Sequence, residues 1–121
     1  MIMGLHIIIP SRDLTDLLVP CLEHLQIAVR NAEMERPTGI TVVDNASSPA
    51  YSPSILKAGI SLPVAWLRFD SHQSFAHGCN QAAQAVEADR ILLLNNDVRL
   101  HPESLIHLLA QLDRHPRVGI C

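Results

Sequence analysis

Residues 5–12 read LHIIIPSR, a short and nearly continuous apolar run that ends in a proline and two polar residues. Leu5 to Ile9 is rich in β-branched side chains. Such a run is typical of a strand that is covered on both faces, as in a parallel sheet. Pro10 ends the run, so Ser11 and Arg12 fall just beyond the carboxyl end of the predicted strand. The stretch therefore indicates an α/β protein.

An alternation of helices and strands continues along the rest of the chain. Apolar residues recur every three or four positions from Leu14 to about Met34, which predicts an amphipathic helix. Ser11 or Asp13 offers its N-cap, and Pro20 should either kink the helix or mark its true start. Further strands are predicted at 40–43, 64–69 and 91–94, with the beginning of a fifth at 118–120, and further helices at 54–59, 74–86 and from 102 to Pro116.

This order predicts an α/β fold with a mainly parallel sheet and helices on both faces. The 121 residues fit one domain. The sheet is expected to be incomplete at its C-terminal end, because the chain stops inside the fifth strand. The end at Cys121 suggests a shortened chain or a split polypeptide, although a complete doubly wound domain could also end near this point.

The composition excludes several classes of protein. A hydrophobic fraction of 48% and a charged fraction of 17% allow a buried core and argue against disorder. A net charge of -3 argues against a general nucleic-acid binder, which needs a basic face. The three cysteines have no spacing typical of a disulfide framework or a zinc site, and no apolar run has the roughly 18 residues of a membrane span. A cytoplasmic protein with reduced thiols is expected.

Polar residues gather where each predicted strand ends. In open α/β sheets, ligands bind beyond the carboxyl ends of the strands. Each cluster by itself is explained by turn formation, because Asn, Asp and Ser favour loops. Four clusters at one edge together favour a binding site. The clusters are residues 11–12, 44–45, 70–73 and 95–97.

Four motifs together resemble a known family. They are LHIIIPSR at 5–12, TVVDNASS at 41–48, SFAHGCN at 74–80 and ILLLNNDV at 91–98. Their order and spacing resemble those of the family 2 inverting glycosyltransferases of GT-A fold. The form of the second and fourth motifs looks like the branch of rhamnosyltransferase-like enzymes of bacterial surface polysaccharides. The resemblance covers almost the whole chain and implies that residues 1–121 are the nucleotide-sugar-binding half of such a domain.

The resemblance implies a set of nucleotide-binding residues. Asp44 matches the acidic residue that accepts a hydrogen bond from the nucleobase, although it could instead be a turn residue that caps its loop. Pro10, Ser11 and Arg12 match the segment that lies along the nucleoside, with a solvated surface charge as the alternative for Arg12. Asn80 matches a polar helix residue close to the nucleotide, or it ties a loop to the helix by hydrogen bonds.

The resemblance also implies a metal site. Asn95, Asn96 and Asp97 match the DxD position, where oxygen ligands suit Mg2+ or Mn2+ bound by carboxylates and substrate phosphates. The usual first Asp is Asn95 here, so Asp97 is the expected metal ligand, while Asn95 and Asn96 contact the nucleotide. The alternative for Asp97 is a helix-capping or turn residue. Ser74 stands where the family usually has glycine, so the chain departs from the family's pattern at this position.

No catalytic residue is predicted within the chain. An inverting transferase needs a general base to deprotonate the acceptor hydroxyl. In this family the base lies past position 121, and Glu103 and Asp113 do not match it. The chain is thus expected to bind a nucleotide-diphosphate sugar but not to transfer the sugar efficiently alone.

Several alternatives and partners stay open. The expected acceptor is a glycan or a lipid-linked molecule, and peripheral association with the cytoplasmic face of a membrane fits such an acceptor. A second hypothesis is a non-catalytic nucleotide-binding or self-associating module, in which an uncovered sheet edge favours homo-oligomers. A nucleotidyltransferase is disfavoured, because residues 10–13 form no glycine-rich, basic phosphate loop.

Overall fold

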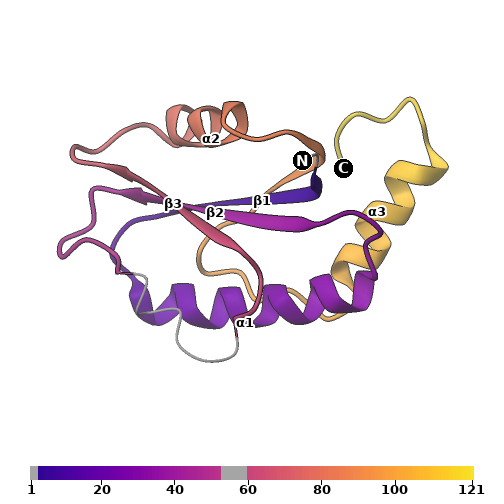
Figure 1. Ribbon diagram of the computed structural model, residues 1–121, viewed down its shortest axis with the longest axis horizontal. Helices are drawn as coiled ribbons and strands as arrows, with labels where there is room; N and C mark the ends of the chain where they lie inside the picture. Colours follow the sequence, from indigo (N-terminus) through magenta and orange to yellow (C-terminus); the bar gives the residue numbers. More distant parts are fainter. Residues whose placement is uncertain (1–2, 53–59) are drawn as a thin grey trace.

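The computed structural model describes residues 3–52 and 60–121 as one parallel sheet with helices packed on both faces (Figure 1). The sheet has four strands in the order β3-β2-β1-β4, and every neighbouring pair is parallel. The predicted α/β fold is confirmed. The elements are β1 (Met3–Ser11), α1 (Thr15–Ala32), β2 (Thr38–Asn45), β3 (Val64–Phe69), α2 (Phe75–Gln84), β4 (Ala88–Leu93) and α3 (Ser104–Arg114).

β1 lies inside the sheet, with β2 on one side and β4 on the other. Its central side chains are completely buried because α1 covers one face of the sheet and α2 covers the other (Figure 1). Ile7 and Ile9 pack toward α1, with Leu18, Leu22 and Leu25. Ile8 packs toward α2, with Val43, Cys79 and Ala82. Burial on both faces explains why this strand is continuously apolar rather than alternating.

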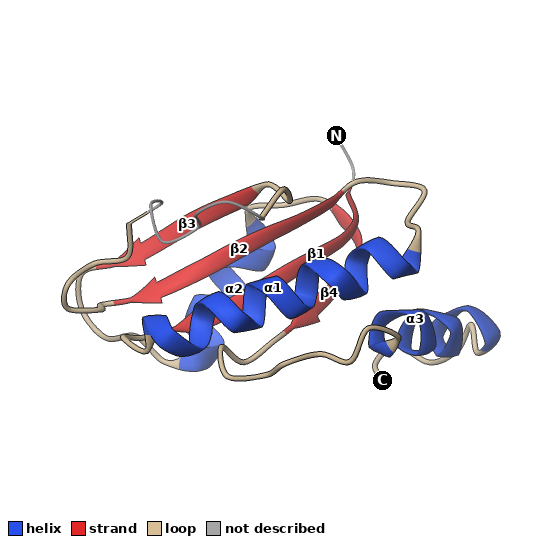
Figure 2. Ribbon diagram, turned by 90° about the horizontal axis from the view of Figure 1, so that it is seen from below, coloured by secondary structure: helices blue, strands red, loops and turns tan. Residues whose placement is uncertain are grey.

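α2 approaches the sheet closely at Gly78. A Cβ atom at this position would lie 3.2 Å from Cγ1 of Val43, so a larger residue would push the helix away from β2. α3 packs beside α1 near the β4 side of the sheet (Figure 2). In the described part of the chain, no helix is both long and apolar enough to cross a membrane.

The start of α1 differs from the prediction. The helix begins at Thr15 and continues through Pro20, so Pro20 is not its start. Its N-cap is Leu14 in the left-handed conformation, and no side chain of the described residues caps it. The Ser11 hydroxyl instead bonds to Tyr51 and Asn96, and the Asp13 carboxylate accepts from Ser48, so neither expected cap is available.

The end of the chain also differs from the prediction. Residues 118–120 form no strand. The Val118 N–H donates to the carbonyl of His115 at 2.8 Å, which closes a turn after α3, and Ile120 is 92% exposed. Three apolar residues are too few to predict a strand, because so short a run forms a strand only when a neighbouring strand pairs with it. The predicted short helix at 54–59 lies outside the described residues.

A buried histidine lies on the α2 side of β1. The His6 side chain shares a 2.7 Å hydrogen bond between its Nε2 and Oγ1 of Thr41, and its Nδ1 has no partner among the described residues. Burial lowers the pKa of His6 below its ordinary value of 6.5. The folded chain therefore takes up a proton on this ring less readily than the unfolded chain does.

We expect the free energy of unfolding to fall as the pH drops below about 6.5, because the unfolded chain then gains a proton that folded His6 resists. The loss should level off once the pH is below the folded pKa. Urea unfolding between about pH 5 and pH 8 measures the slope. His6→Leu should flatten this part of the profile, whereas the exposed His115→Gln should not. An equal slope in His6→Leu would contradict the assignment.

Candidate functional site at the carboxyl edge of the sheet

The ends of β1, β2 and β4 meet at one edge of the sheet. In the parallel register Ser11 lies opposite Asp44, and Asp44 lies opposite Arg68. The side-chain amide of Asn96 donates to Oγ of Ser11 at 2.9 Å. The segments that follow the three strands are therefore in direct contact, and the predicted polar clusters share this edge.

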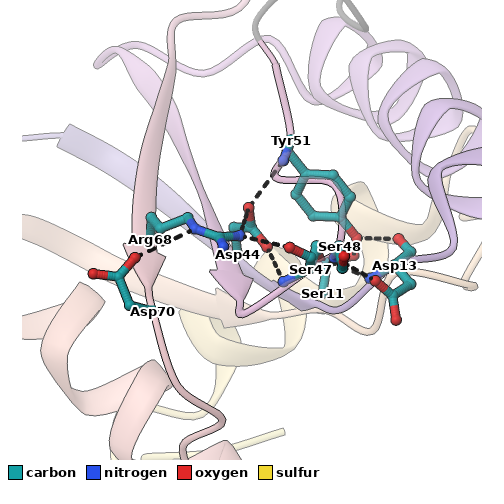
Figure 3. Close-up of polar contacts among 8 residues, drawn as sticks. All are labelled: Ser11, Asp13, Asp44, Ser47, Ser48, Tyr51, Arg68 and Asp70. Carbon is teal, nitrogen blue, oxygen red and sulfur yellow. Dashed lines mark hydrogen bonds and ion pairs between the residues drawn. The ribbon is translucent and has the colours of Figure 1, made fainter.

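Asp44 organises the segment that follows β2. It is 2% exposed, and its carboxylate accepts from the backbone N–H of Ser47 and of Tyr51, each at 3.0 Å, and from Nη1 of Arg68 at 2.9 Å (Figure 3). Burial by itself raises the pKa of Asp44, but the bonds from Ser47, Tyr51 and Arg68 outweigh it and hold the pKa below its ordinary value. Asp44 is thus a charged anchor that ties the loop after β2 to Arg68 of β3.

Asp13 joins the segment after β1 to the segment after β2. Its backbone N–H donates to Oγ of Ser47 at 2.8 Å, its Oδ1 accepts from the N–H of Ser48 at 2.9 Å, and its carbonyl accepts from the Tyr51 hydroxyl (Figure 3). Asp13 and Leu14 have φ of 55° and 47°. The left-handed region is unfavourable for a leucine, so the surrounding bonds must hold this backbone in place.

An open hollow of about 420 Å³ lies over these segments. Asn45 helps to shape it, because its amide pairs with the backbone of Gln73 through bonds of 2.9 Å and 2.8 Å. Phe75 stands at the hollow with more than half of its surface exposed. The hollow combines apolar and polar groups at the position where α/β sheets bind ligands. It is lined by Pro10, Ser11, Arg12, Leu14, Asn45, His72, Gln73, Phe75 and Asn96.

The predicted nucleotide-binding residues lie at this edge of the sheet, with one exception. Pro10, Ser11, Arg12 and Asn96 line the hollow, whereas Asp44 is buried in the hydrogen-bonded network beside it. Asn95 lies on the same loop as Asn96 and is exposed. The structure does not bring the last residue, Asn80, to this hollow. Asn80 lies on α2 and lines a second hollow of about 430 Å³, which is mostly apolar and runs along β4 and α3.

Several polar residues of the site lack a sequence signal. Tyr51 and Ser47 lie in a loop rich in Ser and Pro, where polar side chains usually mark turns. Arg68 is the exception, because it lies near the end of a predicted strand and its register with Asp44 follows once the strands are known to be neighbours. Tyr51 lies in a loop, so no strand register predicts its contacts.

The loop after β4 can bind a cation only if a ligand supplies further oxygen atoms. Within residues 3–52 and 60–121, no three His, Cys, Asp or Glu side chains form a metal-binding group. Asp97 is exposed and supplies a single carboxylate. Mg2+ is commonly held by one or two carboxylates plus substrate phosphates, so the residues fit a cation that a diphosphate brings.

A buried thiol supports this loop from beneath. Burial, with a contribution from the nearby Asp97 carboxylate, raises the pKa of Cys21 to about 11. The neutral thiol donates to the carbonyl of Asn95 at 3.6 Å, which ties α1 to the loop after β4. Cys21 therefore has a packing role here rather than the reactivity of a thiolate.

Comparison with known proteins identifies the family. Residues 6–121 match the sequence profile described as glycosyl transferase family 2, and the chain belongs to that family. No sequence among the curated proteins matches the chain significantly.

Solved structures share the fold. TarS from S. aureus, residues 1–349, superposes with a TM-score of 0.67 at 19% identity over 94% of this chain, and its complex with UDP gives 0.67 at 18% identity over the same share. A third structure of S. aureus TarS gives 0.64 at 18% identity over 94% of this chain. This chain spans 33% of the chain in the first two TarS structures and 20% of the chain in the third.

We expect Asp44→Ala to destabilise the protein by about 3 kcal/mol, because it leaves the N–H donors of Ser47 and Tyr51 without their acceptor and removes the buried carboxylate that pairs with Arg68. Asp70→Ala is the matched control. It removes the other carboxylate beside Arg68, at 3.8 Å, but that carboxylate is fully exposed, so little or no change is expected. Urea unfolding measures both. Equal stability of the two variants would contradict the anchoring role of Asp44.

Proposed function

We propose that the chain is the nucleotide-sugar-binding portion of an inverting glycosyltransferase. In this proposal the whole enzyme transfers a sugar from a nucleotide-diphosphate sugar to a glycan or lipid-linked acceptor. This chain supplies the donor and metal site, and the general base lies elsewhere. Family membership supports the reaction class, and the UDP complex of TarS supports a nucleotide as the ligand.

One contact carries the proposal. The 2.9 Å bond from Asn96 to Ser11 joins the segment proposed for the nucleoside to the segment proposed for the diphosphate and cation. The hollow offers Pro10 and Phe75 as apolar surface and Arg12 and Asn96 as polar or charged groups, and Asp97 follows Asn96 in the chain. This lining suits a ligand that combines a flat, partly apolar group with negatively charged oxygens. A nucleoside diphosphate has this combination.

The proposed roles follow from position and chemistry. Pro10, Ser11 and Arg12 lie along the nucleoside, and Asn95 and Asn96 contact the ribose or phosphates. Asp97 holds Mg2+ or Mn2+ with the diphosphate oxygens, and a bound cation would stabilise the charge on the leaving diphosphate. Asn80 lines the second hollow, so it would contact the nucleotide only if the ligand also extended into that hollow.

Asp44 can bind a nucleobase only if it gives up one of its present partners. Its carboxylate already accepts from Ser47, Tyr51 and Arg68, and burial separates it from the solvent. In our proposal Asp44 accepts from a nucleobase N–H when the segment at Ser47 shifts on binding, while Tyr51 keeps its contacts. In the unbound arrangement the same carboxylate fixes the shape of that segment.

The place of the chain in the cell follows from the proposed donor and acceptor. Nucleotide sugars are charged and water-soluble, so we propose a cytoplasmic location, at the inner face of the membrane when the acceptor is lipid-linked. The motif forms at 41–48 and 91–98 support a rhamnosyltransferase-like enzyme of surface polysaccharide synthesis.

We expect Mn2+ to tighten binding of UDP or dTDP by about tenfold, and Asp97→Ala to remove this effect. Isothermal titration calorimetry with and without Mn2+ measures it. Asp89→Ala is the control, because Asp89 is an exposed carboxylate near the start of β4, at the opposite edge of the sheet. Metal-enhanced binding that survives in Asp97→Ala would refute the cation role. Failure of the wild type to bind any nucleotide would refute the proposed function.

The β4 edge favours a second candidate, a self-associating module. Among the residues that the structure describes, β4 pairs with β1 alone, so its outer backbone edge is open. Ile91 and Leu93 are 45% and 51% exposed on this strand. They lie along the mostly apolar second hollow, which Leu108 and Leu112 of α3 also line. An open apolar edge strand favours pairing with another chain.

For this candidate we expect sedimentation velocity to show a concentration-dependent oligomer that Leu93→Lys converts to a monomer, because a charge on the exposed face opposes burial. Phe75→Lys is the matched control, since Phe75 is similarly exposed but does not line the hollow along β4. A monomer at all concentrations would contradict self-association. A stable oligomer without nucleotide binding would favour this candidate over the transferase.

A further inference from the structure

We propose that the Tyr51 hydroxyl is a positioning group that couples the nucleoside segment, residues 10–14, to the cation loop, residues 95–97. The inference rests on the proposed function for the names of these two segments. It adds a residue outside the four motifs and assigns to it the coupling between the two halves of the site. Tyr51 does not line the hollow, so it acts through its neighbours.

The hydroxyl is the centre of a directed chain of hydrogen bonds. Tyr51 donates to the carbonyl of Asp13, and its oxygen lies 2.6 Å from Oγ of Ser11 (Figure 3). A hydroxyl has one proton, so Ser11 must be the donor to Tyr51. Asn96 in turn donates to Ser11 at 2.9 Å. The chain therefore runs from Asn96 through Ser11 and Tyr51 to Asp13, and it joins the ends of β4 and β1.

The rest of Tyr51 is held independently of its hydroxyl. Its backbone N–H donates to Oδ2 of Asp44 at 3.0 Å, and its ring lies 6.1 Å from that of Trp66 between centroids, tilted by 56°. Tyr51→Phe keeps both of these contacts and removes only the two bonds of the hydroxyl. The substitution therefore separates positioning from packing.

The hydroxyl also stabilises an unfavourable backbone. Asp13 and Leu14 are both in the left-handed region, and Leu14 lines the hollow. Without the hydroxyl, the Asp13 carbonyl and the Ser11 proton lose their partners, and the Ser11 hydroxyl turns to a new acceptor. Asn96 then donates to a group whose orientation is no longer fixed. The Asn96–Ser11 bond, which links the two segments, is then weakened, so ordering one segment by a ligand orders the other less.

The experiment compares UDP binding to the wild type, Tyr51→Phe and Thr41→Val by calorimetry, with and without Mn2+. The measured quantity is the factor by which Mn2+ tightens UDP binding. Thr41→Val is the matched control, because it also removes a buried hydroxyl with a short bond, 2.7 Å to His6, but lies away from the strand ends. We expect Tyr51→Phe to lower the factor about fivefold, the equivalent of one hydrogen bond, and Thr41→Val to leave it unchanged.

A second measurement does not depend on any ligand. Hydrogen exchange of the backbone amides at 95–98 should be faster in ligand-free Tyr51→Phe than in the wild type and unchanged in Thr41→Val. An unchanged Mn2+ factor in Tyr51→Phe, or an equal loss in both variants, would overturn the coupling. If the wild type binds no nucleotide, the proposed function fails, and the exchange rates alone then decide whether Tyr51 links the two segments. Equal exchange in Tyr51→Phe and the wild type would overturn the link.

Discussion

The pairing of β1 on both of its edges is the constraint on which the rest of the structure depends. β1 bonds to β2 and to β4 in parallel, and α1 and α2 bury its two faces. Parallel neighbours end at the same edge, so the polar residues after three strands must meet there. The apolar run at residues 5–9 thus determines where the hollow lies, although none of its side chains lines that hollow.

The strand ends are held together by buried polar contacts rather than by apolar packing. Asp44 is stable as a carboxylate only because donors from the loop after β2 and from Arg68 of β3 compensate for its burial. Asp13 similarly uses its amide, its carboxylate and its carbonyl. Such a network has a defined geometry, which apolar contacts do not impose, and it leaves the hollow accessible. The cost is that loss of one partner leaves others unsatisfied.

Much of the fold follows from the sequence, because strand and helix periodicity reflects which faces are buried. β1, β3 and β4, as well as α1, lie where the pattern predicts them, within a few residues at each end. The N-cap of α1 could not be predicted, since Ser11 and Asp13 have the right chemistry but use it in tertiary contacts. The predicted fifth strand at 118–120 does not form, because a three-residue apolar run is not stable as a strand without a neighbouring strand to pair with.

The site was predictable only in part, because several of its contacts join residues that are far apart in the sequence. Motif resemblance placed Ser11, Arg12 and Asn96 together, and the structure brings them to one hollow. Helical spacing placed Asn80 on α2 but could not show that it lies along β4. Tyr51 reaches Ser11 across 40 positions of sequence, a contact that depends on the parallel register and on no local pattern.

The packing of Tyr51 against Trp66 gives the site an intrinsic fluorescence signal. The sequence has one tyrosine and one tryptophan, and their rings lie 6.1 Å apart beside the strand ends. At this separation tyrosine excitation passes efficiently to the indole. The tryptophan emission of the unlabelled protein therefore reports on the packing of a single loop, and any movement of that loop when a ligand enters would change its intensity.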